Sequence, residues 1–361
     1  MTMPRQQSRF CSSFDATRIA FAIAGNGPLM VEAPHWLSHL DFDWQSRYRS
    51  RYLERMTSAY TLLRTNQRGC GLSDRDPADM SFEAMVRDLE AAVDSAGWTR
   101  FALLGQSQGG AYAVEYAARH PDRVTHLILY GAYARGRSMR DSQYAAADVE
   151  TQIRLVELGW GGDDPAFHHF FAMRFMPDAT PEDRQAMVEL QRASAAGVSA
   201  SRILRTLEMI DVRESASRVR CPTLIMHATG DLAVPFDEGR LLATLIPDAR
   251  LVSLDSRNHI RVEQDPTYEV FFEELHAFVP PGPTAAAPGG SVPPANLTPR
   301  EAEILERVAQ GLDNAQIAAH LDLSEKTVRN HITHIFDKIG VENRGKAIIW
   351  ARTAGFGRQT S

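Results

Sequence analysis

The sequence contains few cysteines and no long apolar run, and both absences exclude whole classes of protein. Its three cysteines, at positions 11, 70 and 221, are scattered along 361 residues, so they predict neither a metal site nor a disulfide framework. No apolar run reaches the roughly 18 residues that span a bilayer. The N-terminal stretch MTMPRQQSRFCSSFDATR has no apolar segment of the kind found in secretory signals. We therefore predict a cytoplasmic protein without contact to a membrane.

Excess positive charge is also missing, except at one end. The chain has a formal net charge of −6, which argues against a protein that coats nucleic acid generally. From position 326 onward, however, seven Lys and Arg residues face two acids, so this end carries about +5 and the rest about −11. A solvated helix would explain such a charge excess, but the asymmetry favours one localised surface for phosphate groups.

A segment without charge or periodicity divides the chain. Residues 279–296, VPPGPTAAAPGGSVPPAN, consist mainly of proline, glycine and alanine, a composition typical of a semi-extended linker. The length suffices for two domains. We predict a first domain over residues 1–278 and a second over residues 297–361.

The first domain alternates short apolar runs with amphipathic segments. This order predicts a mainly parallel β-sheet covered by helices on both faces. Residues 135–218 break the alternation with helical, aromatic-rich sequence, and we predict an inserted helical cap there. The predicted strands are Ile19–Ala24, Leu29–Ala33, Tyr60–Arg64, Phe101–Leu104, Val124–Tyr130, Thr223–Met226 and Ala249–Leu254.

The stretch Gly105-Gln106-Ser107-Gln108-Gly109 lies between a predicted strand and a predicted helix. A G-x-S-x-G stretch in this context is typical of a turn that presents a serine nucleophile at the carboxyl edge of a sheet. The backbone amide of Gln108, at the start of the helix, is well placed to donate to an oxyanion. Taken alone, the same letters also fit an ordinary glycine-rich turn.

A serine hydroxyl needs a base and an acid partner to become a useful nucleophile. Asp231 and His259 each follow a predicted strand, in the order Ser, Asp, His. We therefore predict the triad Ser107, Asp231 and His259, with Asp231 orienting the imidazole. Asp237 and Asp255 remain as weaker candidates for the acid, and each triad member also has an ordinary explanation as a turn or surface residue.

Residues 8 to 278 resemble the α/β-hydrolase family. The resemblance rests on the stretches AIAGNGPLMVEAPHWLSHLDFDW, NQRGCGLSDR, LLGQSQGGAYAVEYAARHPDRV and PTLIMHATGDLAVPF. It implies an α/β-hydrolase fold and the backbone amide of Trp36 as second oxyanion donor. Where the family usually has His-Gly, this chain has Pro34-His35-Trp36, which changes the shape of that corner.

Aromatic residues gather in the predicted cap. Each fits ordinary packing, but together they favour an apolar ligand pocket beneath the cap. The stretch Gly25-Asn26-Gly27 lacks the third glycine and the helix of a dinucleotide site, so we predict neither cofactor nor metal. The predicted pocket residues are Trp160, Phe170, Phe171 and Phe175.

The second domain has the spacing of several short helices. Thr298, Pro299 and Glu301 form a typical helix start, and Ser324 caps a later helix that is apolar on one side and basic on the other. Two short helices with a turn predict a helix-turn-helix arrangement, although a helical bundle for protein contacts has a similar pattern. The basic side predicts contacts with base edges from Arg329 and Asn330, and with phosphates from Lys326, Thr327 and Lys338.

Residues 297–356 resemble the LuxR-type helix-turn-helix family. The matching stretches are LTPREAEIL, GLDNAQIA and LSEKTVRNHITHIFDKIGV, followed by the arginine at position 344. The resemblance implies a small all-α domain that binds double-stranded DNA as a dimer, on an inverted repeat.

Three functions remain open on the sequence alone. The first is a one-component transcription regulator, a homodimer whose hydrolase-like domain binds a small-molecule ligand. The second is a serine esterase or amide hydrolase whose turnover of the ligand controls the attached DNA-binding domain. The third, an interaction scaffold, predicts no affinity for DNA at any salt concentration.

Overall fold

The protein is described here by a computed structural model over residues 6–140, 145–160, 165–282, 299–321, 323–339, 341, 344–353 and 356. The chain divides into two compact units, Met1–Gly282 and Pro283–Ser361. From residue 283 on, the predicted linker lies outside the described residues, as does the predicted helix cap Thr298.

The first unit is built on one sheet of eight strands in the order β1-β2-β4-β3-β5-β6-β7-β8. The strands β3 to β8 run parallel to one another, whereas β2 pairs antiparallel with both β1 and β4. Parallel neighbours place all their carboxyl ends at one edge of the sheet, where ligands bind in open α/β folds. The strands are β1 Gln7–Ser12, β2 Arg18–Ala24, β3 Leu29–Glu32, β4 Thr61–Thr65, β5 Phe101–Gln106, β6 Val124–Tyr130, β7 Thr223–Ala228 and β8 Ala249–Leu254.

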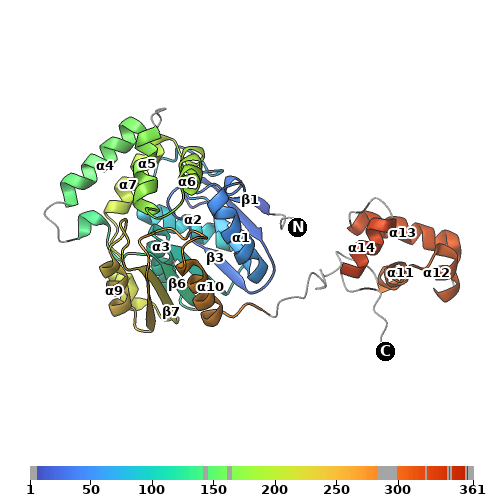
Figure 1. Cartoon of the computed structure of the whole chain (residues 1–361). Coiled ribbons are helices and arrows are strands. Elements are labelled where there is room, and N and C mark those ends of the chain that lie inside the picture. Colours follow the sequence, from blue (N-terminus) through green and yellow to red (C-terminus); the bar gives the residue numbers. More distant parts are fainter. Residues whose placement is uncertain are drawn as a thin grey trace. The chain divides into compact units, whose positions relative to one another are not determined.

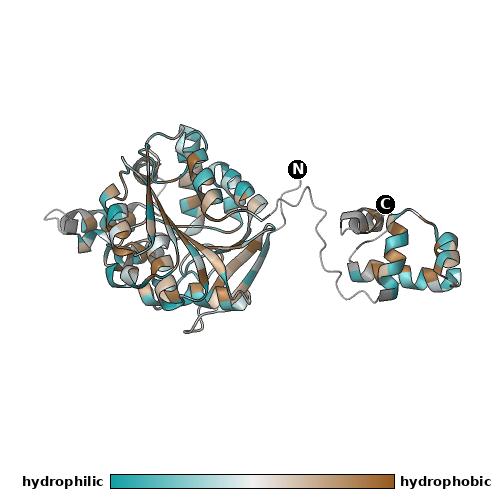
Figure 2. Ribbon diagram, turned by 90° about the horizontal axis from the view of Figure 1, so that it is seen from below, coloured by the Kyte–Doolittle hydropathy of each residue, from teal (hydrophilic) through white to brown (hydrophobic). Residues whose placement is uncertain are grey.

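Helices cover both faces of this sheet (Figure 1). Successive residues of one strand enter different cores: Leu103 joins the core beneath α2 and α3, while Leu104 joins the core beneath α1 and α10. This alternation explains the continuous apolar runs of the central strands, and Figure 2 shows the sheet as largely hydrophobic. The covering helices are α1 Arg47–Ala59, α2 Phe82–Ser95, α3 Gln108–Arg119, α8 Arg213–Arg218, α9 Phe236–Leu245 and α10 Thr267–Phe278, with the short η1 Phe42–Trp44 before α1.

Strand β1 was absent from the sequence prediction. Its residues are mostly exposed because it forms the edge of the sheet, so it lacks the apolar pattern of a buried strand.

Four helices between β6 and β7 rise above the carboxyl edge of the sheet (Figure 1). They are α4 Ala145–Gly159, α5 Pro165–Phe175, α6 Pro181–Ser194 and α7 Gly197–Glu208, preceded by η2 Arg137–Met139. Helix α8 lies within the range predicted for the cap, but it packs against α3 and α9 and so belongs to the layer that covers the sheet.

The second unit contains four helices among its described residues: α11 Pro299–Ala309, α12 Asn314–Leu321, α13 Glu325–Ile339 and α14 Arg344–Thr353. They enclose a core of Ile304, Leu305, Val308, Ile317, Val328, Ile332, Ile335, Ala347 and Ala351. In neither unit does any described helix combine the length and apolar character required to cross a bilayer.

Candidate functional site

Ser107 occupies a sharp turn between β5 and α3. Its backbone has φ 53° and ψ −126°, a conformation that a non-glycine residue adopts only when its surroundings enforce it. The Ser107 amide donates to the carbonyl of Tyr130, at 2.9 Å, which fixes the turn to the neighbouring strand. The hydroxyl thereby stands at the carboxyl edge of the sheet, and Ser107 lines a cavity there.

The glycines around Ser107 are required by close packing. A Cβ atom on Gly109 would lie 2.8 Å from the carbonyl oxygen of Pro34, and one on Gly110 would lie 2.3 Å from Cβ of Ala132. Without side chains at these positions, the start of α3 can approach the loop that follows β3. This contact brings the Gln108 amide next to the Pro34–Trp36 segment.

His259 and Asp231 meet at the same edge. Nδ1 of His259 donates to Oδ2 of Asp231 at 2.6 Å, and Oδ1 of Asp231 accepts from the amides of Ala233 and Val234 at 2.7 and 2.9 Å. Burial would raise the pKa of Asp231, but the positive charge of His259 and these hydrogen bonds outweigh it and lower the pKa. Asp231 is therefore held as a carboxylate that fixes the orientation of the imidazole.

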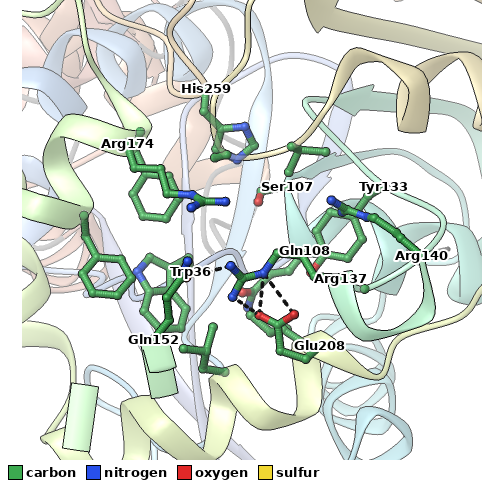
Figure 3. A pocket seen from close by; sticks show the side chains of 17 residues that line it. Trp36, Ser107, Gln108, Tyr133, Arg137, Arg140, Gln152, Arg174, Glu208 and His259 are labelled. Atoms are coloured by element: carbon green, nitrogen blue, oxygen red, sulfur yellow. Dashed lines mark hydrogen bonds and ion pairs between the residues drawn. The ribbon is translucent and has the colours of Figure 1, made fainter. Parts of the chain in front are cut away.

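The other ring nitrogen of His259 makes no hydrogen bond to a described residue. This atom, Nε2, is buried, and Figure 3 shows the imidazole facing Ser107. Gly131 lies directly behind the ring, with φ 54°, and a Cβ there would come within 3.1 Å of Nδ1 and Cε1. The structure thus brings Ser107, Asp231 and His259 together.

The two weaker acid candidates lie elsewhere. Asp237 is exposed in the first turn of α9 and pairs with Arg240 at 3.4 Å. Asp255 is exposed just after β8. Neither has a hydrogen bond to His259, whose acid partner in the described structure is Asp231.

Two backbone amides remain available for an oxyanion. Among the described residues, the amides of Gln108 and Trp36 have no acceptor, and both residues line the cavity that contains Ser107. The carbonyl of Trp36 is held by Nδ1 of His35 at 3.2 Å. Burial, followed by the charge of Arg49, lowers the pKa of His35 to about 4. A neutral imidazole therefore supports the Pro34–Trp36 segment, which lacks the glycine that the family usually has there.

A cavity lies above Ser107, and residues of the cap line it. Phe171 and Phe175, two of the predicted pocket residues, line it together with Leu204 and Leu207 of α7. The cap therefore contributes an apolar side to the cavity.

Phe170 and Trp160, the other two predicted pocket residues, do not line this cavity among the described residues. Phe170 is 45% exposed because it points away from the side of α5 that carries Phe171. Trp160 is buried behind Trp36, against whose ring it packs edge-on at 6.0 Å, while its Nε1 donates to the carbonyl of Ala195 at 3.0 Å. Trp160 therefore supports the Trp36 corner.

The prediction of an apolar pocket was also incomplete, because charged residues line one side. Arg137, Arg140, Arg174 and Glu208 all face the cavity (Figure 3). The sequence carries a signal for two of them in the run Ala134-Arg135-Gly136-Arg137-Ser138-Met139-Arg140. Sequence reasoning missed it because arginines on a predicted cap are ordinarily solvated.

A second, smaller cavity is also lined by Ser107 and His259, together with Trp36 and Phe175. Gln191 of α6 lines it and is only 1% exposed, yet neither polar atom of its side chain has a partner among the described residues. A buried amide without partners is costly.

No group of three or more His, Cys, Asp or Glu side chains among the described residues is arranged to hold a metal.

The cap is joined directly to the loop that carries His259. The carbonyl of Phe175, at the end of α5, accepts from the amides of His259 and Ile260 at 2.9 and 3.2 Å, and the rings of Phe175 and His259 lie 5.7 Å apart. Because Phe175 lines both cavities, a displacement of α5 would also displace the loop that carries His259.

In the second unit, α13 presents polar residues on the side opposite its core residues Val328, Ile332 and Ile335. Lys326, Arg329 and Asn330 are exposed there. Thr327 is half-buried, and both its amide and its hydroxyl bond to Ser324 Oγ, at 3.2 and 2.8 Å. Thr327 thus also belongs to the capping of α13.

Lys338 has a partner that sequence reasoning missed. Its Nζ lies 2.7 and 2.8 Å from the carboxylate oxygens of Glu301, whose side chain is 5% exposed. Glu301 was expected only to cap the start of α11. The pair instead joins α11 to α13, which gives Lys338 a structural role in addition to any contact with phosphate.

Two family models match the chain. The model for the alpha/beta hydrolase fold matches residues 49–266, and the model for bacterial regulatory proteins of the luxR family matches residues 295–351. The first covers more than half of the chain and includes Ser107, Asp231 and His259. The second covers α11 to α13 and most of α14.

Relatives of the first unit are hydrolases by name. The Klebsiella pneumoniae protein RutD, whose name describes a carbamate hydrolase, is 28% identical over 212 residues, 56% of this chain and 76% of its own. The Bacillus subtilis AB hydrolase superfamily protein YisY is 27% identical over 65% of this chain and 86% of its own. A pimeloyl-acyl-carrier-protein methyl ester esterase of Chromobacterium violaceum is 28% identical over 65% of this chain and 88% of its own.

Solved structures agree on the fold. An esterase from Exiguobacterium antarcticum superposes with a TM-score of 0.65 at 24% identity, over 76% of this chain and 99% of its own. A hydrolase from Pseudomonas aeruginosa gives 0.63 at 21% identity, over 76% of this chain and 98% of its own. The chain therefore belongs to the α/β-hydrolase fold family and carries a C-terminal DNA-binding domain of the luxR family of bacterial regulatory proteins.

Proposed function

We propose that this protein is a transcription regulator whose hydrolase-fold unit binds a small ester or amide ligand and whose luxR-family domain binds double-stranded DNA as a homodimer. One observation carries the proposal: Ser107 and His259 line a cavity, and His259 is bonded to the buried Asp231, in the same chain that holds a DNA-binding domain. The ligand's carbonyl would lie at Ser107, beneath the cap.

Hydrolysis of that ligand is the second candidate function. It is favoured by Nε2 of His259, which has no hydrogen-bond partner in the described part of the chain. Ser107 Oγ would attack the carbonyl carbon as His259 takes its proton. The amides of Gln108 and Trp36 would stabilise the oxyanion. His259 would then protonate the leaving alcohol or amine, and water would release the acid from Ser107 by the same steps.

The contact between Phe175 and the His259 loop supports a route from ligand to cap. Beyond the cap, residues 279–296 are rich in proline and glycine and would not transmit a helix rotation. We therefore infer that the ligand acts by changing how two copies associate. Replacing this linker with a flexible one of equal length should leave the ligand response of DNA binding intact, and a lost response would contradict the inference.

The decisive experiment compares the wild-type chain with the variant Ser107→Ala. A fluorophosphonate probe should label wild type at Ser107 and leave the variant unlabelled. Mass spectrometry of co-purifying small molecules should find the intact ligand on the variant and its acid product on wild type. If both proteins carry intact ligand and the probe does not label wild type, the first unit is a receptor and hydrolysis is excluded.

A separate measurement tests the DNA-binding half. The full chain should bind a DNA duplex with an affinity that falls as salt rises, because lysine and arginine displace counterions from phosphates. Undetectable binding at low salt would favour an interaction scaffold instead.

A further inference from the structure

The charged side of the larger cavity contains one arginine whose charge is not matched. Arg137 is fully engaged: its Nε donates to both carboxylate oxygens of Glu208 at 2.9 and 3.1 Å, its Nη2 also bonds to Glu208, and its Nη1 donates to Gln152 at 2.7 Å. The charges of Arg137 and Glu208 therefore compensate each other. Arg140 has no comparable partner among the residues that the structure describes.

The carboxylate nearest to Arg140 is shared. Glu238 Oε1 lies 3.6 Å from Arg140 Nε but 2.9 Å from Arg135 Nη2, and Glu238 Oε2 accepts from the amides of Ala134 and Arg135 at 3.2 and 3.0 Å. Two arginines thus face a single carboxylate, which leaves a net charge of +1 in this cluster. Because a partly buried excess charge is costly, it calls for an anion.

The donors of Arg140 point to where that anion would bind. Its Nε donates to the carbonyl of Arg135 at 3.1 Å, whereas no described residue accepts from either Nη atom. Its guanidinium lies 5.7 Å from the ring centre of Tyr133, and both side chains line the cavity with Ser107. A planar guanidinium with two free Nη groups matches the geometry of a carboxylate.

We propose that the cavity binds an ester or amide that carries a carboxylate, with the carboxylate on Arg140 and the reacting carbonyl at Ser107. The proposal rests on the function proposed above and specifies its ligand class. Arg174 also lines the cavity, on the opposite side from Arg140 in Figure 3. The apolar side, formed by Phe171, Leu204 and Leu207, would cover the chain between the two ends of the ligand.

Two aryl esters matched in acyl length test this assignment in the full chain: 4-nitrophenyl hydrogen glutarate and 4-nitrophenyl pentanoate. Wild type should prefer the glutarate ester in kcat/KM. Arg140→Gln should lower the glutarate-to-pentanoate ratio at least tenfold, and Arg140→Lys should restore part of it. Arg205→Gln is the matched control, since Arg205 is an exposed cap arginine paired with Glu150 and Glu157 away from the cavity, and it should leave the ratio unchanged.

Binding of glutarate itself to Ser107→Ala, measured by calorimetry, separates this proposal from hydrolysis. If glutarate binds and Arg140→Gln abolishes binding, the carboxylate site stands even where no ester is turned over. If Ser107 is labelled by a fluorophosphonate but glutarate neither binds nor slows labelling, hydrolysis stands and the carboxylate site is overturned. An equal loss of kcat/KM for both esters in Arg140→Gln would also overturn the carboxylate site.

Discussion

The two candidate sites differ in how their residues are brought together. In the first unit, Ser107, Asp231 and His259 come from three loops that follow β5, β7 and β8, so the site exists only when the sheet is formed. In the second unit, Lys326, Arg329 and Asn330 lie within two turns of α13, and the helix alone sets their spacing. We therefore expect the first site to be sensitive to small backbone changes and the second to depend mainly on side-chain chemistry.

The largest expected effect is that of Asp231→Asn. The substitution removes the charge that holds His259 in the tautomer needed to accept a proton, and should lower kcat/KM for 4-nitrophenyl esters about 10³- to 10⁴-fold. DNA affinity should not change, because the two sites share no residue. Loss of DNA binding in this variant would show that the sites are coupled through folding.

A backbone change near His259 tests the sensitivity of the first site. Gly131→Ala would place a Cβ 3.1 Å from the imidazole at φ 54°, and should lower kcat/KM about 10- to 100-fold by displacing the ring. Gly97→Ala is the matched control: its φ is 71°, but nothing lies within 4 Å of the added atom. Both variants should lose similar stability, about 1–2 kcal/mol, so equal activities in the two would contradict this account.

Side-chain chemistry should dominate on α13. Arg329→Ala and Asn330→Ala should each weaken binding to the preferred DNA sequence by about 1–3 kcal/mol, whereas Lys326→Ala should weaken binding to all sequences and reduce the salt dependence by about one phosphate contact. Fluorescence anisotropy on specific and unrelated duplexes measures both. Arg87→Ala, which removes an exposed arginine of the first unit, should change neither.

The smallest effect concerns Lys338. Lys338→Met leaves the buried carboxylate of Glu301 without its ammonium partner and should destabilise α11 and α13 by about 1–2 kcal/mol. Hydrogen exchange of these helices measures the loss. Combining it with Glu301→Gln should recover part of it, while the exposed Lys326→Met should cause none. If Lys338→Met weakens DNA binding without affecting exchange, the lysine acts on phosphate alone.

Much of the arrangement could be predicted because it is local or periodic. The apolar runs from Ile19–Ala24 to Ala249–Leu254 became strands β2 to β8. The parallel strands β5 and β7 in the middle of the sheet are buried throughout, and such strands carry continuous apolar sequence. The G-x-S-x-G turn and the order of Asp231 and His259 predicted the triad because each of the three residues lies in a segment that follows a strand.

What escaped prediction depends on neighbours distant in sequence. Arg140 and Glu208 face one cavity because α7 folds back over the segment that follows β6. Phe170 and Phe171 are adjacent in sequence, yet only Phe171 reaches the cavity, because a helix turns them to different sides. The pairing of Lys338 with Glu301 joins two different helices, so it produces no periodic pattern in the sequence that could have predicted it.

The sequence by itself determined the order of Ser107, Asp231 and His259 along the chain, the G-x-S-x-G turn and the helix predicted to bind DNA. Each is encoded by a run of residues short enough for backbone geometry to fix it. The tertiary structure alone decided that Asp231, and neither Asp237 nor Asp255, meets His259, and that the pocket has a positive side. Such choices depend on which side chains converge when helices and strands pack, because burial and charge compensation are properties of the assembled fold.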